Sequence, residues 1–142
     1  MRAKEMWALS GFRGTYTAWA FGDAPDALAE LVKEGKKTGT SSTYDLYGGA
    51  VGEPLPKAGE YSVILDDHGE AVCIIRTTNV YVTLFDQVTA EHARREGEGD
   101  LSLEYWRKVH REFFRKEMEA AGLTFSEKMN VVCEEFVKVY PQ

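Results

Sequence analysis

The chain has 142 residues and a formal net charge of −6, which is the length of one domain with a single hydrophobic core. No apolar run approaches the ~20 residues of a membrane-spanning helix, and the stretch MRAKEMWALSGF lacks the features of a signal peptide. Cys73 and Cys133 lie in apolar runs and are expected to be buried thiols, which favours a cytoplasmic protein. The net negative charge favours a small ligand over a long polyanion as the partner, although it does not exclude a local basic groove.

The first predicted element is a helix over residues 23–35. Asp23 is the expected N-cap, and Pro25 falls in the first turn. Gly35 can adopt the left-handed conformation that ends a helix. A short extended segment is expected around residues 37–40, followed by a polar loop over residues 44–60 in which glycines and prolines cluster.

The second half of the chain predicts a long β-hairpin, two helices and a final strand. The β-rich runs 61–65 and 71–84 flank the turn DDHG. A short helix should begin after Thr89, and a longer one should begin at Asp100 or Ser102 and end at Gly122. The run MNVVCEEFVKVY reads as a closing strand. Antiparallel strands with helices between them, and no βαβ rhythm, predict a single α+β domain built on a small β-sheet or barrel.

The stretch GKKTGT, which follows the first predicted helix, permits two interpretations. Lys36 and Lys37 could simply complement the negative end of the helix dipole, worth about 0.3–1 kcal/mol each. A turn at Gly39 could instead bring the Lys37 amine beside the Thr40 hydroxyl. A lysine beside a hydroxyl is a base–nucleophile pair suited to acyl transfer.

The stretch EHARREGEGD is the second candidate site. His92 and Glu96 are four residues apart and share a helix face. A metal pair is conceivable, but no third ligand and no HExxH motif accompany it, so we expect neither a metal nor another cofactor. Glu96 is either a surface carboxylate or a general acid or base at a loop edge. His110 falls on the apolar stripe of the long helix and is expected to be a hydrogen-bonded core residue.

Several separated blocks, taken in order, resemble the ASCH (activating-signal-cointegrator homology) domain family. These blocks are G-K-K-T-x-T, F-x-x-V-T-x-E-H-A-x-x-E-G and the terminal β-run. Together with the sequence around them, the resemblance covers roughly residues 16–140. The segment GEGDLSLEYWRKVH is similar to a longer bacterial branch of the family. The resemblance implies a PUA-like, mixed and mostly antiparallel β-barrel flanked by helices, with a cleft on one side. It also implies RNA binding, and for some bacterial members a hydrolase activity.

One bacterial branch of that family removes the acyl group from N4-acetylcytidine, and another cleaves RNA. In the amidohydrolase branch a lysine, a threonine and a glutamate act together, and Lys37, Thr40 and Glu96 match them. The N-terminal segment and the long helix depart from that shorter branch, which leaves the substrate open.

Two classes of function therefore remain: a hydrolase acting on a nucleoside-like or short single-stranded RNA substrate, and a non-catalytic RNA-binding module. In the first, Thr40 is the nucleophile, Lys37 accepts its proton, and Glu96 orients Lys37 or moves a proton. Further substrate contacts, by stacking, hydrogen bonding or phosphate pairing, are expected from Lys36, Thr38, Tyr44, Arg76 and Trp106.

Overall fold

A computed structural model of the chain describes residues 1–47 and 54–142. Its elements are α1 (Ala3–Ser10), β1 (Thr17–Ala20), α2 (Pro25–Lys33), β2 (Gly39–Thr43), the 3-10 turn η1 (Tyr44–Leu46), β3 (Tyr61–Leu65), β4 (Ala71–Leu84), the 3-10 turn η2 (Phe85–Gln87), α3 (Ala90–Glu96), α4 (Leu103–Ala120) and β5 (Asn130–Tyr140). Part of the predicted loop, residues 48–53, lies outside the described residues.

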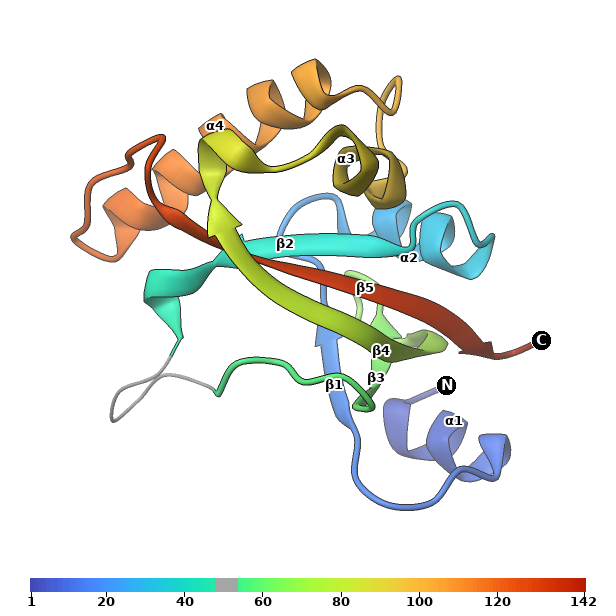
Figure 1. The fold of residues 1–142 in the computed structure, drawn as a ribbon. Helices are drawn as coiled ribbons and strands as arrows, with labels where there is room; N and C mark the ends of the chain where they lie inside the picture. The colour runs from blue at the N-terminus through green and yellow to red at the C-terminus, as the bar shows by residue number, and fades with distance from the viewer. Residues whose placement is uncertain (48–53) are drawn as a thin grey trace.

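The strands form one sheet in the order β1-β3-β4-β5-β2. The β1–β3 pair is parallel and the other three pairs are antiparallel. Register shifts within the β4–β5 pair bend these long strands, since bulges increase local twist. Figure 1 shows the resulting curled sheet, with α3 and α4 above β2 and β4, and with α1 at the opposite end. The predicted α+β fold with a mixed, mostly antiparallel PUA-like sheet is confirmed.

Three apolar clusters hold the helices to the sheet. The largest joins Phe85, Trp106 and Phe114 to the inner face of β5, and so fixes α4. A second packs Ala29 and Val32 of α2 against β3, β4 and β5. The third seats α1 on β3 and β4. These contacts fix α2, α3 and α4. The segments that follow α2 and α3 are therefore held in place beside the edge strand β2.

Several predicted boundaries agree with the structure, and one cap is wrong. Thr89 and Ser102 cap α3 and α4 as predicted, each accepting a hydrogen bond from a backbone N–H in the first turn. Asp23 does not cap α2: the N-cap is Ala24, in a left-handed conformation, with no side-chain cap. Neither α1 nor β1 was predicted, because an eight-residue helix and a four-residue strand depend on tertiary packing. Within the described residues, no helix has the length and apolar character needed to cross a membrane.

Candidate functional site

Lys37 is a buried lysine in the short segment between α2 and β2. The two residues after Gly35 continue past α2, and the backbone N–H groups of Lys36 and Lys37 donate to the Leu31 carbonyl at 2.9 and 3.1 Å. The next N–H, that of Thr38, donates to the Arg95 carbonyl of α3 at 2.7 Å. The chain is therefore held between the ends of two helices, and the Lys37 side chain is turned inward with only 2% of its area exposed.

The Lys37 ammonium lies between two carboxylates. Its Nζ donates to Glu98 Oε2 at 2.8 Å, to Glu96 Oε1 at 3.4 Å and to the Glu96 carbonyl at 3.3 Å. These three contacts occupy the three N–H donors of an ammonium group. The Phe21 ring lies 5.2 Å from the same Nζ and adds a cation–π contact.

Glu96 is the centre of this buried network. Its Oε2 accepts hydrogen bonds from the Ser41 hydroxyl at 2.7 Å, the Trp106 indole N–H at 2.6 Å and His92 Nε2 at 2.8 Å. Its Oε1 faces Lys37 Nζ and, at 3.4 Å, His110 Nε2. The Glu96 carboxylate thus joins β2, α3 and α4.

The pKa of Glu96 lies well below its usual value. Burial alone would raise this pKa, but the charge of Lys37 and the hydrogen bonds from His110 and His92 outweigh it. A carboxylate so strongly held in its charged form is a poor proton acceptor. The Glu96 carboxylate is therefore a buried counter-charge to the Lys37 ammonium.

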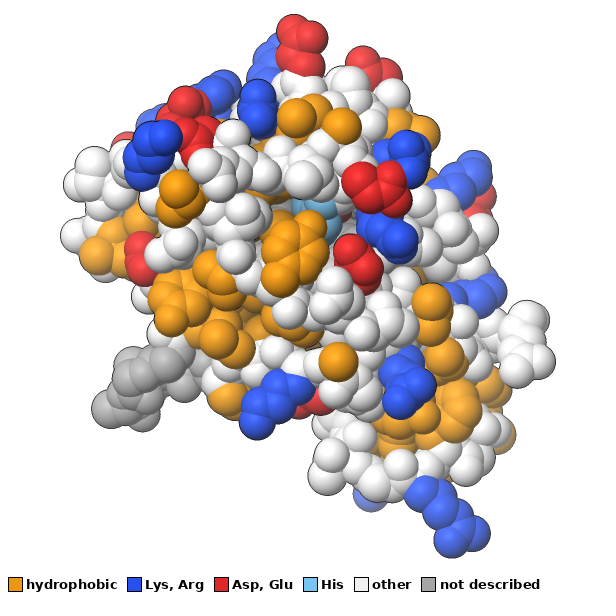
Figure 2. All heavy atoms as spheres, in the orientation of Figure 1, with side chains coloured by type: hydrophobic (Ala, Val, Ile, Leu, Met, Phe, Trp, Pro, Cys, Tyr) orange, Lys and Arg blue, Asp and Glu red, His pale blue; other side chains and the backbone are white. Residues whose placement is uncertain are grey.

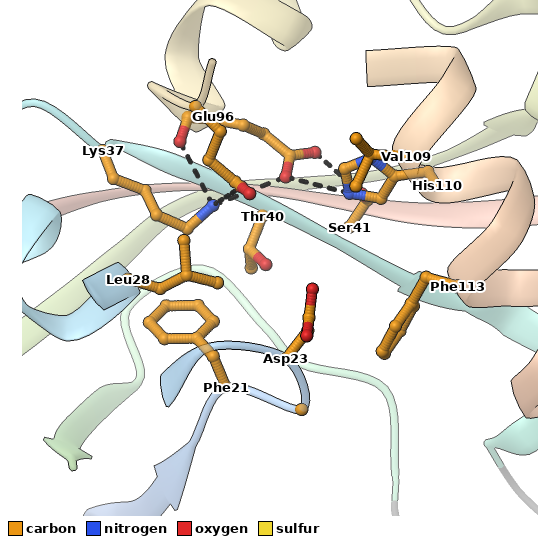
Figure 3. A pocket seen from close by; sticks show the side chains of 12 residues that line it. Phe21, Asp23, Leu28, Lys37, Thr40, Ser41, Glu96, Val109, His110 and Phe113 are labelled. Carbon is orange, nitrogen blue, oxygen red and sulfur yellow. Dashed lines mark hydrogen bonds and ion pairs between the residues drawn. The ribbon is translucent and has the colours of Figure 1, made fainter. Parts of the chain in front are cut away.

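A small pocket of about 80 Å³ lies beside this network. Figure 3 shows Lys37, Glu96 and His110 linked across one side of the pocket, with the Thr40 side chain extending from β2 into the space between Phe21 and Phe113. Its lining residues are Phe21, Gly22, Asp23, Leu28, Lys37, Thr40, Ser41, Glu96, Glu98, Val109, His110 and Phe113. All three residues of the predicted Lys–Thr–Glu group line one pocket.

Thr40 is in the pocket but is not a hydrogen-bond partner of Lys37. The Lys37 donors point at Glu96 and Glu98, and it is the Ser41 hydroxyl that contacts Glu96. Two successive residues of the edge strand β2, Thr40 and Ser41, both line this pocket.

The other predicted contact residues lie outside the pocket lining. Lys36 is exposed and pairs with Glu34 at 3.2 Å, as a cation at a helix end does. The Thr38 hydroxyl donates to the Arg95 carbonyl. Tyr44 and Arg76 are exposed side chains away from the pocket wall. Trp106 is 2% exposed and lies behind the wall, where it supports Glu96.

Sequence reasoning missed the role of Ser41, Glu98, His92 and His110 in this site. The His92–Glu96 spacing permits a metal pair, and the structure shows a direct hydrogen bond between the two side chains. Among the described residues, no group of three or more metal-ligating side chains is found. His110 was expected as a core residue; it does bond the Trp106 carbonyl at 2.9 Å, but it also faces the pocket.

The sequence and the fold match a known family. The family model for the ASCH domain matches residues 17–140, and the chain belongs to the ASCH domain family. No curated protein matches the chain.

Solved structures agree with this assignment. An ASCH domain from Lactobacillus crispatus JV V101 is 32% identical, with a TM-score of 0.87 over 97% of this chain and 92% of that one. The protein EF3133 from Enterococcus faecalis V583 is 34% identical, with a TM-score of 0.81 over 96% of this chain and 88% of that one. The hypothetical protein PH0355, at 19% identity and a TM-score of 0.57, shares the fold.

Proposed function

We propose that the protein is a hydrolase that cleaves the amide bond of N4-acylated cytidine-like nucleosides. The observation that carries this proposal is the buried Lys37, held by Glu96 and Glu98 in a pocket that also contains the Thr40 hydroxyl. A buried lysine is costly unless its charge is paired, and a surface-facing lysine at the same helix end would serve the dipole equally well. The arrangement supports a chemical role.

The contacts of Lys37 suggest how it could act as a base. All three of its N–H groups are donated, so the amine must release one proton before it can take the proton of Thr40. Glu98 Oε2, at 2.8 Å and with its side chain 20% exposed, is placed to accept that proton. The neutral Lys37 amine then removes the Thr40 proton as its oxygen attacks the acyl carbon.

The shape and charge of the surroundings favour a small substrate. The pocket of about 80 Å³ is far below the ~300 Å³ of a typical whole-ligand site, so it suits the acyl end of a ligand. A wider hollow of about 690 Å³ shares Gly22, Asp23, Val109 and Phe113 with it and offers room for a base and sugar. Figure 2 shows acidic and basic side chains interspersed on the face that it draws, which suits a small ligand better than a long polyanion.

The test is turnover of N4-acetylcytidine by the wild type and by the Lys37→Ala and Thr40→Ala variants. Both variants should lose at least about 10²-fold in kcat, since each lacks a group that acts on the reacting atoms. Thr78→Ala is the matched control, because its hydroxyl is exposed on β4, donates to the Glu135 carbonyl and lies outside the pocket lining. Its kcat should stay near the wild-type value.

Two outcomes would contradict the hydrolase. Undiminished turnover by Lys37→Ala or Thr40→Ala would remove the mechanism. A wild type that binds cytidine or a short single-stranded RNA without any turnover would favour the alternative, a non-catalytic RNA-binding module. Release of labelled fragments from the same RNA would instead indicate phosphodiester cleavage.

A further inference from the structure

Two histidines meet the Glu96 carboxylate, and their hydrogen bonds differ. His92 Nε2 lies 2.8 Å from Glu96 Oε2, while its Nδ1 is buried without a hydrogen-bond partner among the described residues. One N–H, on Nε2, satisfies this ring.

His110 has an acceptor at each of its ring nitrogens. Its Nδ1 lies 2.9 Å from the Trp106 carbonyl oxygen, which can only accept a hydrogen bond. Its Nε2 lies 3.4 Å from Glu96 Oε1, and that carboxylate already receives donors from Lys37, Ser41 and His92. A ring nitrogen without a hydrogen would point its own lone pair at an acceptor oxygen, so both nitrogens must carry a hydrogen. The geometry therefore favours an imidazolium at His110.

The charges around His110 agree with this assignment. Glu96 faces it from α3, Glu98 from the loop after α3, Lys37 from the segment before β2 and Asp23 from the loop before α2. Burial would lower the pKa of His110, but the hydrogen bond and charge of Glu96 outweigh it and raise the pKa above its usual value. With Lys37 and His110 charged, two cations balance Glu96 and Glu98.

His110 also stands in the right place for a reaction. It lines the pocket from α4, and its side chain is 13% exposed. The Trp106 ring stacks on it at 4.3 Å and 14° and so fixes its plane. In Figure 3 it lies across the pocket from Lys37, with Thr40 between them. A leaving group bound between Thr40 and α4 would meet the His110 ring.

We propose that His110 is the proton donor to the leaving amine in this pocket, an inference that rests on the amide hydrolysis proposed above. Thr40 Oγ1 forms a bond to the acyl carbon as its proton passes to the neutral Lys37 amine. The C–N bond then breaks, and the leaving nitrogen takes a proton from His110 Nε2, which leaves a neutral imidazole and an acyl ester on Thr40.

The second half of the reaction restores both groups. The neutral His110 ring removes a proton from a water molecule, whose oxygen attacks the ester carbon. The C–Oγ1 bond breaks, and the Lys37 ammonium returns the proton to Thr40. The net change is one water consumed, with one carboxylic acid and one amine released.

The experiment compares His110→Gln with the wild type on two substrates. N4-acetylcytidine has an amine leaving group that needs a proton, whereas p-nitrophenyl acetate has a leaving group that departs without one. His110→Gln should lose about 10²–10³-fold in kcat on the amide. It should keep the rate of the initial burst of p-nitrophenolate, which reports acylation of Thr40 alone, within about threefold of the wild type. The wild-type rate on the amide should fall as pH rises above the His110 pKa, and the variant should lack this limb.

The matched control is His92→Gln, which also removes a contact to Glu96 but leaves the pocket wall intact. It should lower both activities equally. Equal losses in His110→Gln would overturn the proton-donor role, because a merely structural role affects both substrates alike.

An NMR titration of the ring nitrogens separates this inference from the proposed hydrolase itself. Two N–H groups on His110 at pH 7 are expected in the wild type. A neutral His110 ring in an active enzyme would overturn the proton donor alone. A wild type that turns over neither substrate, even with a charged ring, would overturn the hydrolase and with it the donor step.

Discussion

At the scale of single residues, the Glu96 carboxylate is the most heavily bonded group of the site. It is 2% exposed and bonded by side chains from β2, α3 and α4 and by Lys37. Replacing Glu96 by glutamine would leave Glu98 as the carboxylate that balances the buried Lys37 charge. It would also place an amide N–H₂ group against side chains that are themselves hydrogen-bond donors. Breaking a buried ion pair by removing one partner costs about 3–5 kcal/mol.

We therefore expect Glu96→Gln to lower the free energy of unfolding by about 3 kcal/mol or more at pH 7, measured by urea denaturation. Glu98→Gln is the control, since its side chain is 20% exposed, and its loss should be clearly smaller. Because the pKa of Glu96 is lowered in the folded state, its contribution is complete above the ordinary value of 4.5 and is lost as pH falls through the folded pKa. A pH-independent difference between wild type and Glu96→Gln would contradict this account.

At the scale of elements, the end of α3 sets the position of Lys37. Gly97 ends α3 with φ +70°, and a Cβ there would lie 2.3 Å from the Lys36 carbonyl oxygen and 3.1 Å from Lys37 Cα. Only glycine allows both the left-handed backbone and this close approach. The α3 terminus and the segment before β2 are thus fitted to each other.

Gly97→Ala should accordingly be worse than an ordinary glycine substitution. Gly35→Ala is the matched control: it too has a positive φ, +81°, but nothing lies within 4 Å of its added Cβ. We expect Gly35→Ala to cost about 1–2 kcal/mol of unfolding free energy and Gly97→Ala distinctly more, with a drop in Tm measured by circular dichroism. Equal losses would show that the Lys36 segment moves aside without cost.

The elements were predictable from the sequence where local signals are strong. Caps at Thr89 and Ser102 and the DDHG turn have direct chemical signatures, and they gave the hairpin and both later helices correctly. The cap of α2 failed because Ala24 adopts a left-handed conformation that no local rule favours. The short pieces α1 and β1 are held by packing on β3 and by pairing with it, and such non-local support leaves little periodicity to detect.

The site was predictable only in part, because it too depends on contacts between residues that are far apart in the sequence. Lys37, Thr40 and Glu96 were singled out through motif spacing and the family resemblance, and they line one pocket. Glu98 and Ser41 join it because two chain segments 55 or more residues apart in sequence meet there. Nothing local to GEGD or TSS indicates that meeting, since it is decided by the docking of α3 on β2.

At the scale of the whole molecule, one buried carboxylate outside the site should shape how stability depends on pH. Glu134 lies on β5 opposite Thr40 of β2 and Val80 of β4, with 8% of its area exposed. Burial, together with the charge of Glu60, raises the pKa of Glu134 to about 7. The unfolded chain, with a value near 4.5, gives up this proton at lower pH than the folded chain does.

The sign of the effect follows from proton uptake. Between pH 4.5 and about 7 the folded state binds more protons at Glu134 than the unfolded state, so its contribution to stability falls as pH rises through that window. The shift from 4.5 to about 7 corresponds to a loss of at most about 3 kcal/mol. Glu134→Gln keeps the size of the side chain and removes the titration. The variant should therefore gain stability relative to the wild type on going from pH 4 to pH 8.

Urea denaturation at half-unit steps from pH 4 to pH 8 would measure this difference. Glu104→Gln, an exposed substitution in the first turn of α4, is the control and should follow the wild-type curve within about 0.5 kcal/mol. A Glu134→Gln curve parallel to the wild type across the whole range would show that Glu134 stays charged in the fold. The expected result is a relative gain in the stability of Glu134→Gln that develops between pH 4.5 and about 7. It would show that ionising Glu134 destabilises β5, the strand that pairs with β2 and so positions Thr40.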